Sequence, residues 1–532
     1  MSYKSQTTSL ESTGQFSKLM LDFVSKNEKT KLLYDFHFSN FDVNEYLKTN
    51  SFAHVDRNLL VEELIKQNSS ISISDLTKQN IELLRSNNTF TVTTGHQLCL
   101  FTGPLFFIYK ILTVINFCEE LNKKHADKNF VPVYWMASED HDFEEVNHAY
   151  LFGKKLAWQT EQKGKVGDFK LNEIAPALEE LKTILGTSDR AVELYTKIES
   201  FYKSSNLATA TRLLVNELFG NYGLVILDAD NKELKKQFIT EFKKDIFENT
   251  AIKTVSETNN YLTENGYSVQ VNPREINVFY TDTNLRERIE LRGDKYCVNN
   301  TSVEFSKTEL EQKLESETEI FSPNVILRPM YQQKIMPNIA YVGGPGEIVY
   351  WLQYKKMFEA FDLPYPLLQP RNFAMVIDKG SQGKLQKLNF EFLDLFESIE
   401  TLTKKLISSE AEEIELSAEK NELNTLFEKI KTTAGQIDKT LEGSVAAELQ
   451  KTIKGIEMIE QKIIRSIKAK NETAINQIKT LKNKFFPENN IQERHDNLSS
   501  FYLNNKDFIE DIKTAFAKNE VSNLAYLLLL EE

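Results

Sequence analysis

Residues 130–137 read FVPVYWMA and are followed directly by residues 138–148, which read SEDHDFEEVNH. The first stretch has the length and the apolar, aromatic content of a buried strand. The charged stretch therefore begins at the carboxyl end of that strand, the edge where open α/β sheets bind their ligands. As an alternative, Ser138 could be a helix N-cap followed by first-turn acids, although this explains neither of the two histidines.

The acids and histidines of residues 138–148 predict a reaction centre, because ionisable clusters at strand ends tend to be functional sites. The candidate catalytic residues are Glu139, Asp140, His141 and Asp142. Ser138, Asn147 and His148 are candidates for binding a substrate or nucleotide. Asp140, His141, Asp142 and His148 could in principle hold zinc or manganese, but the chain has no HExxH spacing, so we predict no metal cofactor.

A second strand is predicted at residues 89–93, followed by a polar loop. An amphipathic helix then begins with Pro104 at its first position and continues through Cys118. With strand 130–137 this makes a β-loop-α-β unit, which is the building block of a parallel sheet. A further strand at residues 223–227 extends the sheet. The expected fold class is therefore α/β with a parallel-sheet core.

Two glycine-containing regions have the composition of ligand-binding loops. Residues 94–104 combine glycines, polar side chains and a helix N-terminus, which together favour phosphate or carboxylate. Residues 343–347 read GGPGE and bring backbone amides close to a ligand. A plain turn is the alternative in both places. The candidate binding residues are Thr94, Gly95, His96, Gln97, Thr102, Gly103, Gly343, Gly344, Gly346, Glu347 and Trp351.

Two arginines are candidates for gripping a carboxylate. Arg328 and Arg371 each carry a guanidinium group that can form two parallel hydrogen bonds with such a group. Either could instead be half of a structural ion pair. Lys110 and Gln332 complete the predicted set of binding residues.

Composition limits the classes of partner. The chain has 532 residues, a net charge of −13, and three cysteines without a CxxC pair. The negative charge argues against a nucleic-acid partner. The cysteine pattern indicates neither a disulfide framework nor a structural zinc site, and it favours a reducing compartment. Without an apolar signal segment or a membrane-spanning run, we expect a cytoplasmic protein with no membrane partner.

The character of the sequence changes after Arg371. Glycine and proline become rare, and apolar residues recur at heptad spacing from Leu388 to Leu406 and again from Leu449 to Ala474. This pattern indicates an antiparallel hairpin of the coiled-coil type, with turns at residues 434–435 and 442–444, and it favours self-association. Ordinary bundle helices packed on the core are the alternative.

We divide the chain into seven regions. They are N-terminal helices with the first half of the core (1–150), a helical insertion (151–205), a continuation of the core (206–265), a small mixed insertion with strands such as residues 267–271 (266–320), the second half of the core (321–380), the coiled-coil region (381–485) and a C-terminal helical segment (486–532).

Several motifs together resemble the bacillithiol biosynthesis cysteine-adding enzymes. These motifs are residues 94–97 (TGHQ), 100–105 (LFTGPL), 131–135 (VPVYW), 138–143 (SEDHDF), 147–148 (NH), 327–329 (LRP), 343–347 (GGPGE), 486–487 (FP) and 491–494 (IQER). The likeness extends along nearly the whole chain. It implies a Rossmann-like core with two connecting insertions, and a coiled-coil region through which the chain forms a homodimer.

The resemblance also implies a reaction, in which a ligase joins the carboxyl group of cysteine to the amine of glucosaminyl-malate in the last step to bacillithiol. Because a free carboxylate resists attack by an amine, we expect ATP with magnesium to activate it. The alternatives are a metal-dependent amide or sugar hydrolase that uses the Asp140, His141, Asp142 and His148 cluster, and a coiled-coil scaffold without enzymatic activity.

For the ligase, each group of candidate residues has an expected role. The loops at Gly95 and at residues 102–103 would hold phosphate or carboxylate. His141, oriented by Asp140 or Asp142, would be the general base. Arg328, Arg371 or Lys110 would clamp the malate carboxylates.

Overall fold

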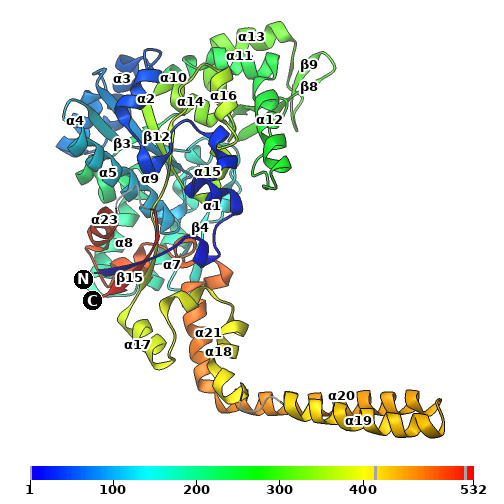
Figure 1. The fold of residues 1–532 in the computed structure, drawn as a ribbon. Coiled ribbons are helices and arrows are strands. Elements are labelled where there is room, and N and C mark those ends of the chain that lie inside the picture. Colours follow the sequence, from blue (N-terminus) through cyan, green and yellow to red (C-terminus); the bar gives the residue numbers. More distant parts are fainter. Residues whose placement is uncertain (1–2, 413–415, 520–523) are drawn as a thin grey trace. The chain divides into compact units, whose positions relative to one another are not determined.

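The computed structural model describes residues 3–412, 416–519 and 524–532. The chain forms two compact units, of which the first is Met1–Val376 with Asn490–Glu532 and the second is Ile377–Asn489. The first unit contains the parallel sheet, and the second is built from helices (Figure 1).

A parallel sheet forms the core of the first unit. Its strand order is β13-β12-β2-β3-β6, and every neighbouring pair is parallel. The strands are β2 (Thr89–His96), β3 (Asn129–Met136), β6 (Val225–Asp228), β12 (Asn338–Gly343) and β13 (Leu367–Pro370). This confirms the predicted α/β fold class. The strand order reverses direction between β2 and β12, and such a switch point opens a crevice at the carboxyl ends of the strands.

Two boundaries in this unit differ from the prediction. β2 continues to His96, because its last residues pair in register with Tyr134, Trp135 and Met136 of β3. The helix after it, α5 (Phe106–Lys124), begins two residues later than expected. Pro104 is outside the helix because it forms a bridge with Asn497 of the C-terminal segment, and the backbone N–H of Leu105 donates to Asp496 O.

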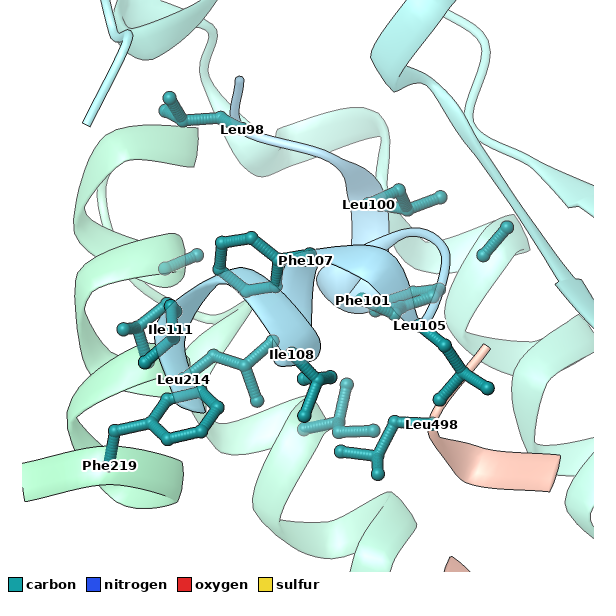
Figure 2. Packing of buried hydrophobic residues seen from close by; sticks show 14 of the residues in the cluster. Leu98, Leu100, Phe101, Leu105, Phe107, Ile108, Ile111, Leu214, Phe219 and Leu498 are labelled. Carbon is teal, nitrogen blue, oxygen red and sulfur yellow. The ribbon is translucent and has the colours of Figure 1, made fainter. Parts of the chain in front are cut away.

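The turn between β2 and α5 is held by hydrophobic packing and by side chains distant in the sequence. Phe101, Thr102 and Gly103 all have positive φ. Leu98, Leu100 and Phe101 are buried with residues of α5, of α9 (Leu207–Phe219) and Leu498 (Figure 2). The Tyr202 hydroxyl accepts a hydrogen bond from Phe101 N at 2.8 Å. These contacts stabilise a backbone shape that a non-glycine residue seldom adopts.

The region after β3 is mixed rather than purely helical. A hairpin of β4 (His148–Leu151) and β5 (Lys154–Ala157) precedes the helices α7 (Ala175–Leu185) and α8 (Asp189–Phe201). The hairpin lies within the residues 151–205 that the sequence suggested as a helical insertion, apart from its first residues.

A second sheet, antiparallel throughout, has the order β10-β9-β8-β7-β11. Its strands are β7 (Val278–Asp282), β8 (Leu285–Arg292), β9 (Lys295–Val298), β10 (Glu304–Phe305) and β11 (Phe321–Pro323). The predicted strand at residues 267–271 is wrong. There the side chain of Gln353 takes the place of a neighbouring strand, because its Oε1 accepts from Gln270 N and Val271 N and its Nε2 donates to Val271 O.

The two chain termini share a third sheet, with the order β1-β15-β14. β1 (Tyr3–Thr8) pairs antiparallel with β15 (Tyr526–Glu531), and β14 is Phe373–Ile377. The C-terminal segment predicted as helical (486–532) contains helices at Ser499–Tyr502 and Phe508–Ala517, but it ends in the strand β15, which was not predicted. A continuous apolar run such as residues 526–530 fits a helix and a buried strand equally well, and only its partners decide between them.

The second unit contains a long antiparallel helical hairpin. Helices α19 (Ser417–Ile437) and α20 (Leu441–Lys470) lie side by side (Figure 1), and Lys420 of α19 pairs with Glu460 of α20 at 2.5 Å. The predicted turns at residues 434–435 and 442–444 are wrong, because the chain reverses between them, where Asp438 Oδ1 accepts from Thr440 N and Oγ1. The first predicted heptad seam is not one helix. It begins at Leu388, directly after α17 (Lys379–Lys387), and continues through a 3-10 helix (Phe392–Phe396) into α18 (Ile399–Glu412).

The remaining helices complete the two units. They are α1 (Lys18–Val24), α2 (Val43–Thr49), α3 (Arg57–Asn68), α4 (Asp75–Leu83), α6 (Phe143–Val146), α10 (Lys232–Lys236), α11 (Ile239–Glu248), α12 (Thr250–Glu264), α13 (Lys307–Ser316), α14 (Arg328–Ile335), α15 (Pro345–Trp351), α16 (Lys355–Ala360), α21 (Glu472–Phe485), α22 (Ser499–Tyr502) and α23 (Phe508–Ala517). Among the helices of the described residues, none has the length and apolar character needed to span a bilayer.

Candidate active site

A cavity of about 720 Å³ opens at the carboxyl ends of β2, β3 and β12. It lies at the switch point of the parallel sheet, and the antiparallel sheet and the C-terminal segment complete its wall. Thirteen predicted site residues line it: Gly95, His96, Gln97, Lys110, Ser138, Glu139, Asp140, His141, Arg328, Gly344, Gly346, Glu347 and Arg371.

An ion pair between the buried Lys110 and the partly buried Glu347 joins α5 to the first turn of α15. Lys110 Nζ lies 2.6 Å from Glu347 Oε2 and also donates to Gly95 O. Glu347 accepts from the Tyr341 hydroxyl at 2.6 Å and from Gly344 N at 2.9 Å. Burial by itself raises the pKa of Glu347, but Lys110 and these hydrogen bonds outweigh it and lower the pKa. Glu347 is therefore ionised and holds the Lys110 ammonium group, which is already engaged in this ion pair.

The two predicted arginine clamps have different environments. Arg371 is fully buried and forms a bidentate ion pair with Glu493, at 2.7 and 3.1 Å. Arg328 is partly buried, and its guanidinium lies about 6 Å from the ring centroids of Trp135, Tyr341 and Trp351. Its Nη1 donates to Gln332 Oε1 at 3.0 Å. Among the described residues no carboxylate forms an ion pair with Arg328, so this cation remains available to a ligand.

The acids that follow β3 have separate surroundings. Glu139 lies 2.6 Å from Lys235, a lysine that also pairs with Asp230. Asp140 accepts from His141 N and from Gln97 Nε2, both at 2.7 Å. Burial by itself raises the pKa of Asp140, but the neighbouring His141 side chain, the hydrogen bond from Gln97 and the charge of Arg286 hold this pKa well below its usual range. Asp140 is therefore an ionised acceptor that orients its neighbours.

His141 contacts the antiparallel sheet. Its Nδ1 lies 2.7 Å from Arg286 Nη1, and its ring packs against Phe279 with centroids 5.3 Å apart. Arg286 also donates to Ser322 Oγ and to Pro323 O, and its guanidinium lies 4.0 Å from the centroid of the Phe279 ring. The residues predicted as a reaction centre after β3 thus contact residues of β7 and β8.

Two family models together match nearly the whole chain. The model described as "Bacillithiol biosynthesis BshC, N-terminal Rossmann-like domain" matches residues 3–372, and "Bacillithiol biosynthesis BshC, C-terminal coiled-coil domain" matches residues 374–522. The chain belongs to the BshC family. This confirms the resemblance drawn from the motifs, and with it the Rossmann-like core and the coiled coil.

Relatives from three bacteria carry the name "Putative cysteine ligase BshC". The Flavobacterium johnsoniae protein is 45% identical over 93% of this chain and 94% of its own length. The Flavobacterium psychrophilum protein is 44% identical over 93% and 94%, and the Cytophaga hutchinsonii protein is 40% identical over 94% and 95%.

In this BshC family member, other predicted site residues support the cavity from outside. Thr94 Oγ1 donates to Val342 O, Asn497 Nδ2 donates to Gly103 O and Thr102 Oγ1, and Gly343 O accepts from Arg371 N. Gln332 holds Arg328, and Trp351 stacks on Tyr341 with centroids 4.1 Å apart. Asn147 O accepts from Trp158 N, His148 contacts Asn147 Oδ1, and Asp142 is exposed. In the described part of the chain, the cavity lining includes none of the predicted residues Thr94, Thr102, Gly103, Asp142, Asn147, His148, Gln332, Gly343 and Trp351.

The metal cluster considered as an alternative, Asp140 and His141 with Asp142 and His148, does not assemble in the described residues. Within residues 3–412, 416–519 and 524–532, no group of three or more His, Cys, Asp or Glu side chains is placed to hold a metal ion. His148 belongs to the β4–β5 hairpin, whereas Asp140 and His141 face the cavity. The arrangement gives no support to the metal-dependent hydrolase.

The sequence analysis did not predict four arginines that other parts of the fold contribute to the cavity. Arg286 and Arg288 alternate along β8, Arg274 precedes β7, and Arg494 lies in the C-terminal segment. Alternating arginines are common on solvated strands, so the sequence gives no sign that they face a cavity. Only Arg494 had a signal, because it lies within one of the motifs shared with the BshC family.

His96 is a neutral group in this site, and its replacement by glutamine tests that state. Burial and the charge of Lys110 lower the pKa of His96 to about 3, and its ring packs between Phe106 and Phe107. We expect His96→Gln to retain kcat/KM within about threefold, or ~0.6 kcal/mol, since an amide supplies a neutral donor and acceptor. Steady-state kinetics between pH 5 and 9 measure this. A tenfold loss, or the disappearance of a pH-dependent limb, would contradict it.

Proposed function

We propose that this chain is a cysteine ligase that joins the carboxyl group of L-cysteine to the amine of glucosaminyl-malate, the last step to bacillithiol. The observation that carries the proposal is the charge of the cavity. Among the described residues seven cationic and four acidic side chains line it, although the chain as a whole carries a net charge of −13. An excess of guanidinium groups in a concave site suits a ligand with several carboxylates, such as a malate conjugate.

Arg328 is the group that best fits one malate carboxylate. It lines the cavity, it has no carboxylate partner among the described residues, and the aromatic rings of Trp135 and Tyr341 lie near its guanidinium group. A charged pair formed in such surroundings is stronger than one in bulk water. The predicted alternatives fit less well, because Lys110 and Arg371 are already held by Glu347 and Glu493.

ATP with magnesium is the proposed source of activation. Arg274, Arg288 and Arg494 line the cavity and have no ion pair with a carboxylate in the described part of the chain, so they fit the phosphate groups. Bound ATP would supply the free energy that converts the unreactive cysteine carboxylate into a form that an amine can attack. Gly95 contributes less than expected to phosphate binding, since its carbonyl oxygen already accepts from Lys110.

The test is mass-spectrometric detection of bacillithiol after the full chain is incubated with cysteine and glucosaminyl-malate. Parallel reactions contain ATP with magnesium, ATP with EDTA, or neither. Product that requires both ATP and magnesium supports the proposal in full. Product without ATP supports the ligase and overturns ATP as the activator. No product from folded protein in any reaction overturns the assignment of substrates.

We further propose that the chain acts in the cytoplasm as a homodimer joined through the α19–α20 hairpin. Several large apolar side chains of the hairpin are exposed, including Leu426 (53%) on α19 and Met458 (62%) and Ile459 (52%) on α20. Apolar residues at such exposure along a coiled-coil hairpin are the surface that a second copy would cover.

Introducing charge on the apolar face of the hairpin tests the dimer. We expect the wild-type chain to be a dimer by light scattering, and the double variant Leu426→Glu with Met458→Glu to be a monomer, because each glutamate would be buried without a partner. The control is Glu422→Gln, an exposed polar position of the same helix, which should remain a dimer. A monomeric wild-type chain, or a variant that stays dimeric, would contradict the proposed interface.

A further inference from the structure

The contact between His141 and Arg286 fixes the position of one proton. Arg286 Nη1 lies 2.7 Å from His141 Nδ1. A guanidinium group has N–H donors only and no acceptor, and it keeps its charge in proteins. Nδ1 must therefore be the acceptor in this hydrogen bond, which means that it carries no proton.

A neutral imidazole with an unprotonated Nδ1 has its proton on Nε2. The His141 side chain is half exposed, at 45%, and it lines the cavity. In the described part of the chain, Nε2 has no hydrogen bond to another protein group, whereas Nδ1 faces Arg286 and lies 3.7 Å from Asp140 Oδ1. The nitrogen that is free to meet a ligand is thus a donor.

The groups around Arg286 keep it in place. Its Nε and Nη2 donate to Ser322 Oγ and to Pro323 O at 3.1 Å, and its planar group stacks on Phe279. The side chain is buried. A proton added to Nδ1 would replace the hydrogen bond by a contact between two cations, so Arg286 and the general-base role predicted for His141 oppose each other.

We propose that Arg286 is a positioning residue that holds His141 as a neutral imidazole protonated on Nε2, and that His141 donates this N–H to an oxygen of the cysteine carboxyl group. The second half rests on the proposed ligase function. Negative charge accumulates on that oxygen when the amine adds to the carboxyl carbon, and a fixed donor stabilises such charge. In this role His141 transfers no proton, and the deprotonation of the amine belongs to another group.

The position of the proton can be measured without any substrate. We expect spectra of the full chain labelled with ¹⁵N-histidine to show His141 with a protonated Nε2 and an unprotonated Nδ1, with His141→Gln assigning the signal among the seven histidines. Arg286→Leu should release this state and give a mixture of tautomers or a charged ring. Arg288→Leu, two residues away on β8, should leave it unchanged. A charged or Nδ1-protonated His141 in the wild-type chain would overturn the proposal.

Two substitutions separate a donor from a general base in the ligase assay. Glutamine retains an N–H donor but cannot take up a proton, whereas leucine does neither. We expect His141→Gln to lose about tenfold in kcat and His141→Leu about a thousandfold, as for removal of a fixed donor to developing charge. Equal, complete loss in both variants would overturn the donor role. If the wild-type chain itself makes no product, the proposed function fails while the spectra still decide the role of Arg286.

Discussion

Replacing Arg328 by leucine is expected to lower kcat/KM for glucosaminyl-malate by two to three orders of magnitude, or about 3–4 kcal/mol, while leaving the fold intact. Arg328 has no carboxylate partner among the described residues, so its removal leaves no buried acid unpaired in the free protein. The loss would appear when the ligand binds. A malate carboxylate would then lie beside the aromatic rings of Trp135 and Tyr341 with no guanidinium group to pair with. Initial rates at varied glucosaminyl-malate measure it, and circular dichroism checks folding.

Two comparisons make this expectation specific. Arg328→Lys keeps the charge but loses the planar fork, so its loss should be about tenfold. Glucosamine, an amine acceptor without malate, should be used poorly and at the same rate by the wild-type chain and by Arg328→Leu, because neither can make the missing contact. An equal loss with both acceptors would show that Arg328 does not act by holding malate.

The core of the fold was readable from sequence because its signals are local. The run at residues 130–137 is long enough and apolar enough to be a buried strand, and β3 occupies it to within one residue at each end. The amphipathic spacing of the apolar residues in α5 likewise predicts a helix that packs on a sheet. The predictions that failed concern segments whose structure depends on contacts with residues far away in the sequence. Residues 267–271 are capped by Gln353, and β15 is a strand because β1 and β14 border it.

In the candidate site too, only the residues with a local sequence signal could be predicted. Residues at or just after the end of a predicted strand, such as Gly95 and Asp140, could be placed at the sheet edge from sequence, and they do line the cavity. Position relative to a strand does not show whether an arginine already has a carboxylate partner. Arg328 and Arg371 look alike in sequence, and the difference arises because Glu493, 122 positions after Arg371, lies opposite one of them and not the other.

The Arg371–Glu493 pair leads to the second large effect, which is on stability. We expect Glu493→Ala to destabilise the protein by about 3–5 kcal/mol, because it leaves the guanidinium of Arg371 buried without a counter-charge. Arg371 and Glu493 have side chains only 1% and 4% exposed, and Glu493 also accepts from Ala374 N at 3.0 Å. Urea unfolding followed by circular dichroism measures the change.

The control pair is Lys356–Glu257, whose side chains are 53% and 63% exposed. Because solvent screens such a pair, Glu257→Ala should change stability by less than about 0.5 kcal/mol. Removing both buried charges, in Arg371→Met with Glu493→Leu, should recover much of the loss, since two apolar side chains of similar size leave no charge without a partner. If Glu493→Ala were as stable as Glu257→Ala, water or another group would have to reach Arg371, and the cation would then be available to a ligand alongside Arg328.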